Sequence, residues 1–168
     1  MLFRSYAALE EITPAAYRLP TDGEWSFAAG IGALETGATP KEKDKKLSDV
    51  FPWGTTYPPP AGVGNFGDET AKAMFTNWPY IKNYTDGFAT AAPVGSFTPN
   101  PFGIFDLAGN AQEWCADWYD ARATKRVMRG GAWVNCSAKS FLSSARGSVS
   151  PERHSVVTGF RCVLDAHQ

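Results

Sequence analysis

The fold is decided by residues 101–119, which read Pro-Phe-Gly-Ile-Phe-Asp-Leu-Ala-Gly-Asn-Ala-Gln-Glu-Trp-Cys-Ala-Asp-Trp-Tyr. A tight turn at residues 108–110 stands between apolar residues, and three carboxylates, Asp106, Glu113 and Asp117, lie around it in the sequence. Carboxylates beside exposed turn carbonyls are oxygen ligands of the kind that Ca2+ takes. The alternative is a Trp-rich core strand whose acids face water, and this stretch by itself leaves both interpretations open.

Length and composition describe an ordinary globular domain. The chain has 168 residues, which is long enough for one domain with a substantial core. Its net charge of −1 shows no excess of positive charge of the kind that nucleic-acid binding uses. No apolar run approaches the length of a membrane span. The sequence therefore predicts neither a nucleic-acid partner nor a membrane segment.

The cysteines and histidines exclude several kinds of site. Cys115, Cys136 and Cys162 are odd in number and widely spaced, which fits neither a disulfide framework nor a zinc site. The only histidines are His154 and His167, so a His-rich metal site is excluded. A Ser-His-Asp hydrolase is disfavoured because only one histidine lies well inside the domain.

Local signals predict a mixed α and β domain with many turns. Thr21 followed by Glu24 is a capping box, which predicts a helix from Asp22 to Ala29 that ends at Gly30. Another short helix is predicted after residues 65–69. Short strands are predicted at residues 93–97, 126–129, 132–134 and 156–164. Frequent Gly and Pro between such short elements indicate an irregular α+β fold.

Three segments complete this prediction. Met1–Ala16 is predicted to be a short helical or irregular lead-in. Ala33–Asp49 mixes lysines with acids and carries little apolar content, which is typical of a solvated loop. Phe51–Gly54, Phe-Pro-Trp-Gly, is predicted to return to the core as an apolar plug.

Six segments in order resemble one family, that of the formylglycine-generating enzyme, also called sulfatase-modifying factor. They are Tyr17–Trp25, Phe51–Gly54, Pro93–Phe97, Asn100–Cys115, Arg126–Trp133 and Gly159–Val163. The resemblance implies a C-type-lectin-like fold with short antiparallel strands and one or two helices. It also implies one domain over residues 1–168 that lacks the family's N-terminal portion, since only 18 residues precede Leu19.

The resemblance further implies two structural calcium sites, each with four protein groups. The first predicted site consists of Asn65, the Phe66 carbonyl, Asp86 and the Phe88 carbonyl. The second predicted site consists of Asp106, the Gly109 and Ala111 carbonyls, and Glu113. Water would complete the roughly 6–8 oxygen ligands that calcium prefers. The alternative is that these acids only cap turns, and Asp117 is expected to be a structural partner rather than a ligand.

The family's oxidase chemistry is disfavoured in this chain. It requires a copper-binding cysteine pair spaced C-x4-C, because thiolates are the ligands that suit Cu(I). The corresponding positions carry Asn135 and Ser140, while Cys136 stands one position later and Phe141 stands five residues beyond it. One thiol cannot form the pair, so copper is not expected and no catalytic residue is assigned. Iron-dependent relatives need a histidine cluster that this chain lacks.

A non-catalytic binding module remains, and its expected ligand is a protein or another surface ligand. The resemblance extends to variable proteins of diversity-generating retroelements, whose C-terminal strand and loop region is diversified. We call the corresponding residues the display face: Trp133, Val134, Asn135, Cys136, Ser137, Gly147, Ser148, Val149, His154, Ser155, Val156 and Val157. Loops held by a stiff scaffold are a common place for recognition.

Two alternatives to the binding module stay open. One is an oxidase with a relocated thiol at Cys136, and the other is a structural or sensor domain of a larger signalling protein. Arg146 and Arg161 are expected to be internal, paired with core acids such as Asp117 or with backbone carbonyls. Trp133 is expected to belong to the core more than to a sugar-stacking surface.

Overall fold

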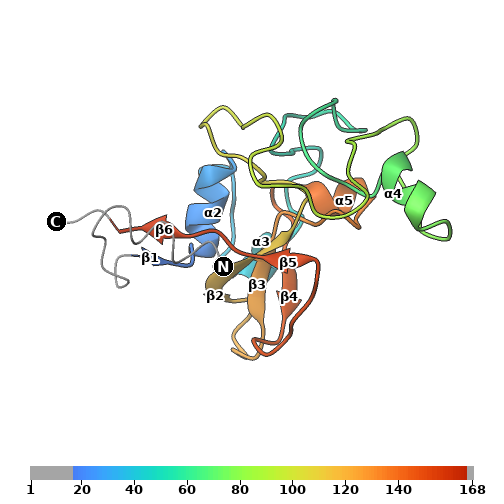
Figure 1. The fold of residues 1–168 in the computed structure, drawn as a ribbon. Helices are drawn as coiled ribbons and strands as arrows, with labels where there is room; N and C mark the ends of the chain where they lie inside the picture. The colour runs from blue at the N-terminus through green and yellow to red at the C-terminus, as the bar shows by residue number, and fades with distance from the viewer. Residues whose placement is uncertain (1–16, 166–168) are drawn as a thin grey trace, which may run out of the picture.

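The computed structural model describes residues 17–165 of the chain (Figure 1). The predicted lead-in Met1–Ala16 lies outside the described residues, as does His167. The helices are α2 (Asp22–Ala28), α3 (Pro40–Lys43), α4 (Glu69–Met74) and α5 (Ala138–Phe141). The strands are β1 (Tyr17–Arg18), β2 (Gln112–Trp118), β3 (Arg126–Arg129), β4 (Gly147–Val149), β5 (Thr158–Gly159) and β6 (Val163–Leu164). Short elements joined by long irregular segments confirm the predicted α+β class. None of these helices is long and apolar enough to cross a membrane.

Helix α2 begins at the capping box that the sequence predicts. The Thr21 side chain accepts a hydrogen bond from the Glu24 backbone N–H, and the Glu24 carboxylate accepts one from the Thr21 backbone N–H at 2.7 Å. The Asp117 carboxylate on β2 also accepts from the Asp22 N–H at 2.6 Å, where the helix dipole favours negative charge. The helix ends one residue before the predicted end, and Gly30 follows with φ of +79°.

Strand β2, which comes from the deciding stretch, lies inside a four-stranded sheet of order β4-β3-β2-β5. It pairs antiparallel with β3, where Glu113 lies opposite Arg129, and parallel with β5. Strands β1 and β6 form a separate two-stranded ribbon, which lies beside α2 in Figure 1. Residues 112–118 of the stretch therefore form an inner strand of the sheet, as the strand alternative expected. Its acids do not all face water, because Glu113 is buried.

Three strand predictions need correction. Residues 93–97 and 132–134 form no strand, and 156–164 contains only the short strands β5 and β6. Gly95 has φ of +76°, which breaks an extended run. At 132–134 the Asn135 side-chain oxygen accepts from the Ala132 N–H at 2.8 Å and holds a turn.

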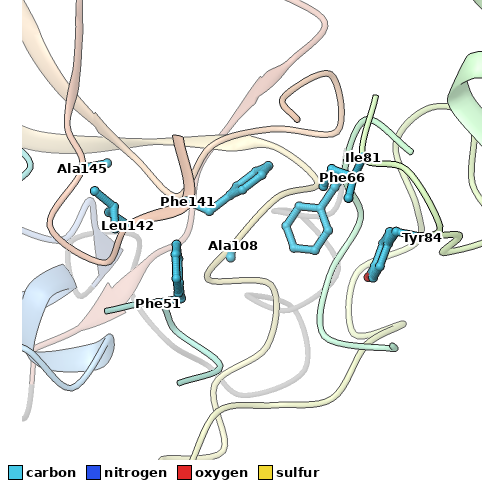
Figure 2. Close-up of a cluster of buried hydrophobic side chains, with 8 residues drawn as sticks. All are labelled: Phe51, Phe66, Ile81, Tyr84, Ala108, Phe141, Leu142 and Ala145. Carbon is cyan, nitrogen blue, oxygen red and sulfur yellow. The ribbon is translucent and has the colours of Figure 1, made fainter. Parts of the chain in front are cut away.

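Among residues 17–165, two hydrophobic clusters form the core, and the chain passes from one to the other between Leu107 and Ala108. The first cluster, drawn in Figure 2, contains Phe51, Phe66, Ile81, Tyr84, Ala108, Phe141, Leu142 and Ala145. The second contains Trp25, Ala29, Ile31, Leu107, Cys115 and Val127. The neighbours Leu107 and Ala108 thus belong to different clusters, and the buried Phe51 confirms the predicted apolar plug.

A buried network of charges lies between the helix and the sheet. Arg146 contacts the carboxylates of Asp22 at 2.8 Å and Glu35 at 2.6 Å, and its side chain is fully buried. Arg129 also pairs with Asp22 and lies over the Trp25 ring at 4.2 Å from its centroid. Burial opposes the charge on Asp22, but Arg129 and Arg146 hold the pKa of this carboxyl below its ordinary value. Two cations and two carboxylates leave the buried network neutral.

This network corrects two predictions and confirms one. Arg146 is internal and pairs with core acids and a backbone carbonyl as expected, but the acids are Asp22 and Glu35 and not the suggested Asp117. Ala33–Asp49 is not wholly a solvated loop, because it contains α3 and because the Glu35 side chain is only 3% exposed. Charged composition alone could not reveal a pairing between residues that are 111 positions apart.

Candidate functional site

The structure brings the residues of the first predicted calcium site together. One oxygen of Asp86 accepts from the Phe66 N–H at 2.8 Å, and the other accepts from the Phe88 N–H at 2.9 Å. Asn65 is fully buried, and its NH2 group donates to the Thr90 carbonyl at 2.8 Å. Its side-chain oxygen is buried without a hydrogen-bond partner. An orphaned buried oxygen of this kind costs free energy unless another group, such as a cation, satisfies it.

The first predicted site is also negatively charged and lacks a cationic side chain. Asp68, which caps α4, is fully buried and accepts from the Asp86 N–H at 2.7 Å. Burial, with a contribution from the charge of Asp68, raises the pKa of Asp86 to about 6. Within residues 17–165 neither carboxylate forms an ion pair. Two carboxylates without an ion pair, one of them bonded to the N–H of Phe66 directly after Asn65, supply oxygen ligands of the kind that a hard cation takes.

The second predicted site carries a cation from the protein itself. Glu113 accepts from Arg161 at 2.6 Å and from the Trp25 indole N–H at 2.8 Å. The Arg161 guanidinium also donates to the Asp106 carbonyl at 3.3 Å. Arg161 is partly buried and, as expected, pairs with an acid and with backbone carbonyls, although the acid is Glu113 and not Asp117. One Asp106 side-chain oxygen accepts from the Gly95 N–H at 2.7 Å, while the other is buried without a partner. This site therefore fits calcium less well than the first.

The turn of the deciding stretch links the two predicted sites. The Asn110 N–H donates to the Asn65 carbonyl at 2.8 Å, and the Asn110 side chain bonds to Asn65 and Ala92. Gly109 has φ of +75°, and a Cβ there would lie 2.1 Å from the Asn65 carbonyl oxygen. Only glycine permits this approach. Ala111, the remaining predicted carbonyl ligand, lies half-buried directly before β2.

Clusters of strongly metal-binding side chains are absent from the described residues, the two predicted calcium sites included. In the described part of the chain no three His, Cys, Asp or Glu side chains are placed to hold a metal ion. A calcium site here must therefore draw on the Asn65 amide and on backbone carbonyls as well as on carboxylates. Sequence reasoning missed Asp68, although its position just before α4 marks it as a helix cap.

A polar cleft of about 210 Å3 lies where the family's cysteine pair would stand. We call it the Lys139 cleft, and its lining residues are Lys45, Gln112, Gly130, Gly131, Asn135, Lys139, Ser140, Ala145, Arg146 and Gly147. Both cysteine-equivalent positions, Asn135 and Ser140, therefore line one cleft. Gln112, Lys45 and Lys139 were not among the predicted site residues, and the one local signal for them is that Lys139 directly precedes Ser140.

The thiol of Cys136 does not replace the missing pair. Cys136 is half-buried, packs against the first hydrophobic cluster and does not line the Lys139 cleft. Its carbonyl accepts from the Tyr57 hydroxyl at 2.6 Å, and burial raises the pKa of its thiol. A raised pKa lowers the fraction of thiolate, the form that binds Cu(I). The residues present do not fit a copper bis-thiolate site.

The residues of the display face differ in solvent exposure and line two different clefts. Trp133 is 6% exposed and stacks on Trp78 with ring centroids 5.8 Å apart, so it belongs to the interior. Val134, Asn135, Cys136, Gly147, Ser148, Val149, Ser155 and Val157 are partly exposed, and Ser137, His154 and Val156 are exposed. Asn135 and Gly147 line the Lys139 cleft, and Ser148 and Val149 line a second, open cleft.

These features define the class of the protein. It has an irregular α+β fold of the formylglycine-generating-enzyme type, with Asn135 and Ser140 at the positions of the family's cysteine pair. Residues 4–166 match the model of the sulfatase-modifying factor enzyme 1-like domain. The chain belongs to this family.

Relatives with known names include both active and inactive types. The chain is 29% identical over 178 residues to the formylglycine-generating enzyme of Thermomonospora curvata, a match that covers 94% of this chain and 52% of that protein. It is 32% identical over 155 residues to the inactive C-alpha-formylglycine-generating enzyme 2 of Bos taurus, covering 89% and 44% of the two chains. The chain thus spans about half the length of these relatives.

A solved structure shares the fold. Treponema denticola variable protein 1 superposes with a TM-score of 0.56 at 24% sequence identity, covering 87% of this chain and 46% of that one. At this level of identity the likeness shows the fold alone. The fold is therefore shared by proteins named as formylglycine-generating enzymes and by one named as a variable protein.

Proposed function

We propose that this chain is a non-catalytic binding module whose ligand is a protein. The observation that carries the proposal is the Lys139 cleft, where Asn135 and Ser140 occupy the positions of the family's cysteine pair. An amide and a hydroxyl cannot replace two thiolates as Cu(I) ligands. The similarity to an inactive formylglycine-generating enzyme 2 supports a family member without the oxidase chemistry.

The display face is the proposed recognition surface. Its exposed members His154 and Val156 lie on the connection between β4 and β5, and Ser137 lies just before α5. A rigid core that holds such connections suits recognition. The fold shared with a variable protein supports a region open to diversification. A retroelement origin predicts a reverse transcriptase and a near-identical template repeat beside the gene.

Calcium is the proposed structural cofactor, with the first predicted site favoured. Asn65 and Asp86 would be its side-chain ligands, and the Phe66 and Phe88 carbonyls would contribute further oxygens. The support is the orphaned Asn65 oxygen and the absence of an ion pair at Asp86 in the described residues. The ion would join the segment before α4 to the segment after it and stiffen the scaffold beneath the display face.

Two experiments test the proposal. The first is a Cu(I) titration combined with oxygen uptake on a cysteine-containing peptide; stoichiometric binding with turnover would contradict a non-catalytic role. The second places a photo-crosslinking residue at Ser137 or His154, with Lys82 as an exposed control position. A host protein captured from both display-face positions, not from Lys82, and competed by unlabelled chain is the expected result. Equal capture at Lys82 would reject the display face.

A further inference from the structure

The Lys139 cleft presents hydrogen-bond donors that have no protein partner. Nothing in residues 17–165 pairs with the Lys139 ammonium, the Ser140 hydroxyl or the Gln112 side-chain amide. The Asn135 oxygen already accepts from the Ala132 N–H at 2.8 Å, which leaves the Asn135 NH2 group free to donate. Lys139 is exposed, and Gln112, Asn135 and Ser140 are partly exposed, so these donors are accessible to a ligand that enters the cleft.

The charges of the cleft favour an anion. Its lining contains Lys45, Lys139 and Arg146 but no Asp or Glu. The Arg146 guanidinium is already committed to buried carboxylates, and Lys45 contacts the neighbouring Asp44 at 3.2 Å. Lys139 therefore remains as the one uncompensated cation of the lining. A local positive charge in a chain of net charge −1 attracts a negatively charged group.

We propose that the Lys139 cleft binds the carboxylate of an acidic side chain on the protein partner. This inference rests on the proposed function, because Asn135 and Gly147 belong both to the cleft and to the display face. A cavity of about 10–15 Å3 already holds one water molecule, so about 210 Å3 admits an entire side chain. The cleft is accessible from solvent, since Lys45 and Lys139 of its lining are exposed, so a group on a partner's surface can reach it.

A carboxylate matches these donors better than a phosphate does. Phosphate sites in proteins typically use bidentate arginines or a succession of free backbone N–H groups. All three guanidinium nitrogens of Arg146, the arginine of this cleft, already donate hydrogen bonds to protein oxygens. One free ammonium together with the amide of Asn135 and the hydroxyl of Ser140 suits a single negative charge with two oxygen acceptors.

The test is an NMR titration of the isotopically labelled full chain. The ligands are a capped nonapeptide with three central glutamates, the same peptide with glutamines, and inorganic phosphate. We expect the glutamate peptide to shift the amide signals of Gly130, Gly131 and Gly147 and the glutamine peptide to leave them unchanged. Loss of one charged contact should weaken binding about fivefold or more in Lys139→Ala, while the matched control Lys82→Ala retains wild-type affinity.

Further measurements keep the outcome unambiguous. Lys139→Glu reverses the charge and should abolish the shifts, and its dispersed spectrum will show whether it is folded. The proposal is wrong if the glutamine peptide binds equally well, if Lys82→Ala weakens binding as much as Lys139→Ala, or if phosphate produces the same shifts at the same or lower concentration. Partner capture at Ser137 that persists despite any of these results would leave the proposed function standing and reject only the carboxylate.

Discussion

Arg161 places its guanidinium 2.6 Å from the carboxylate of Glu113, the side chain that the family resemblance assigns to calcium. The same guanidinium donates to the carbonyl of Asp106, a second predicted ligand. The chain therefore supplies a fixed positive charge where a metal ion was expected. Charge compensation by the protein explains why the two predicted calcium sites, although linked through the same turn, are not equivalent.

Removal of this guanidinium should destabilise the fold and expose the second site to metal. Arg161→Gln should lower the free energy of unfolding by about 2–3 kcal/mol, because Glu113 loses its partner while Arg161 is itself only partly buried. Calcium should recover part of this loss. Urea unfolding with and without calcium measures both effects, and Arg153→Gln, an exposed arginine, is the control. A loss that calcium does not reduce would exclude the second site as a metal site.

Calcium should stabilise the wild-type chain through the first predicted site. At about a hundred times its Kd, calcium would add about 2.7 kcal/mol to the free energy of unfolding. For a chain of this size that corresponds to a rise in Tm of about 5–10 °C. Asp86→Asn should remove the rise, whereas Asp49→Asn, at an exposed aspartate, should retain it. Thermal melts that are the same in calcium and in chelator would refute the site.

Gly109 should tolerate a methyl group far less well than Gly103. Both have positive φ, +75° and +77°, so alanine pays a similar conformational cost of about 1–2 kcal/mol at each. A Cβ at Gly103 meets no atom within 4 Å, whereas one at Gly109 lies 2.1 Å from the Asn65 carbonyl oxygen. Gly109→Ala should therefore fail to fold or lose several kcal/mol more than Gly103→Ala in urea unfolding. Equal losses would show that the close approach of the turn to Asn65 does not occur.

Acid should remove the contribution of Glu24 to stability. Its hydrogen bond with Arg18 lowers the pKa of the Glu24 carboxyl from 4.5 to about 2. A depressed pKa in the folded state means that the contribution is present above the unfolded pKa and disappears as pH falls through the folded one. Urea unfolding from pH 6 to pH 2 should find wild type more stable than Glu24→Gln at pH 6, with the difference closing towards pH 2. A difference that grows in acid would contradict the pairing with Arg18.

The elements predicted correctly from the sequence are those with local signals. The capping box of Thr21 and Glu24 identifies its helix because both partners lie within one helical turn. Strand β3 was predicted at its observed bounds, Arg126–Arg129. Phe51 was recognised as a core residue because apolar residues re-enter there after a charged segment. In each case the decisive interaction partners are close in sequence or follow from hydrophobicity alone.

The features that were missed depend on partners far apart in sequence. Glu35 reads as part of a charged loop, and only the fold brings Arg146 to it. Arg161 was expected to be internal, but its pairing with Glu113 could not be derived from spacing. The Lys139 cleft brings Lys45 and Gln112 to residues 130–147, and local signals in the sequence do not show that these distant residues lie together. Predicted ligand positions came from the family resemblance, whereas the electrostatic difference between the two predicted calcium sites came from the structure.

Leu107 and Ala108 are neighbours in the chain but belong to different hydrophobic clusters. A single-residue insertion between them would displace one cluster relative to the other, and no local adjustment could restore both at once. The connection at residues 150–157 bridges two sheet edges mainly through exposed positions, so its length is much less constrained. Insertions and deletions among members of the family should therefore be found in the connection at residues 150–157 and be absent from the turn at residues 108–110.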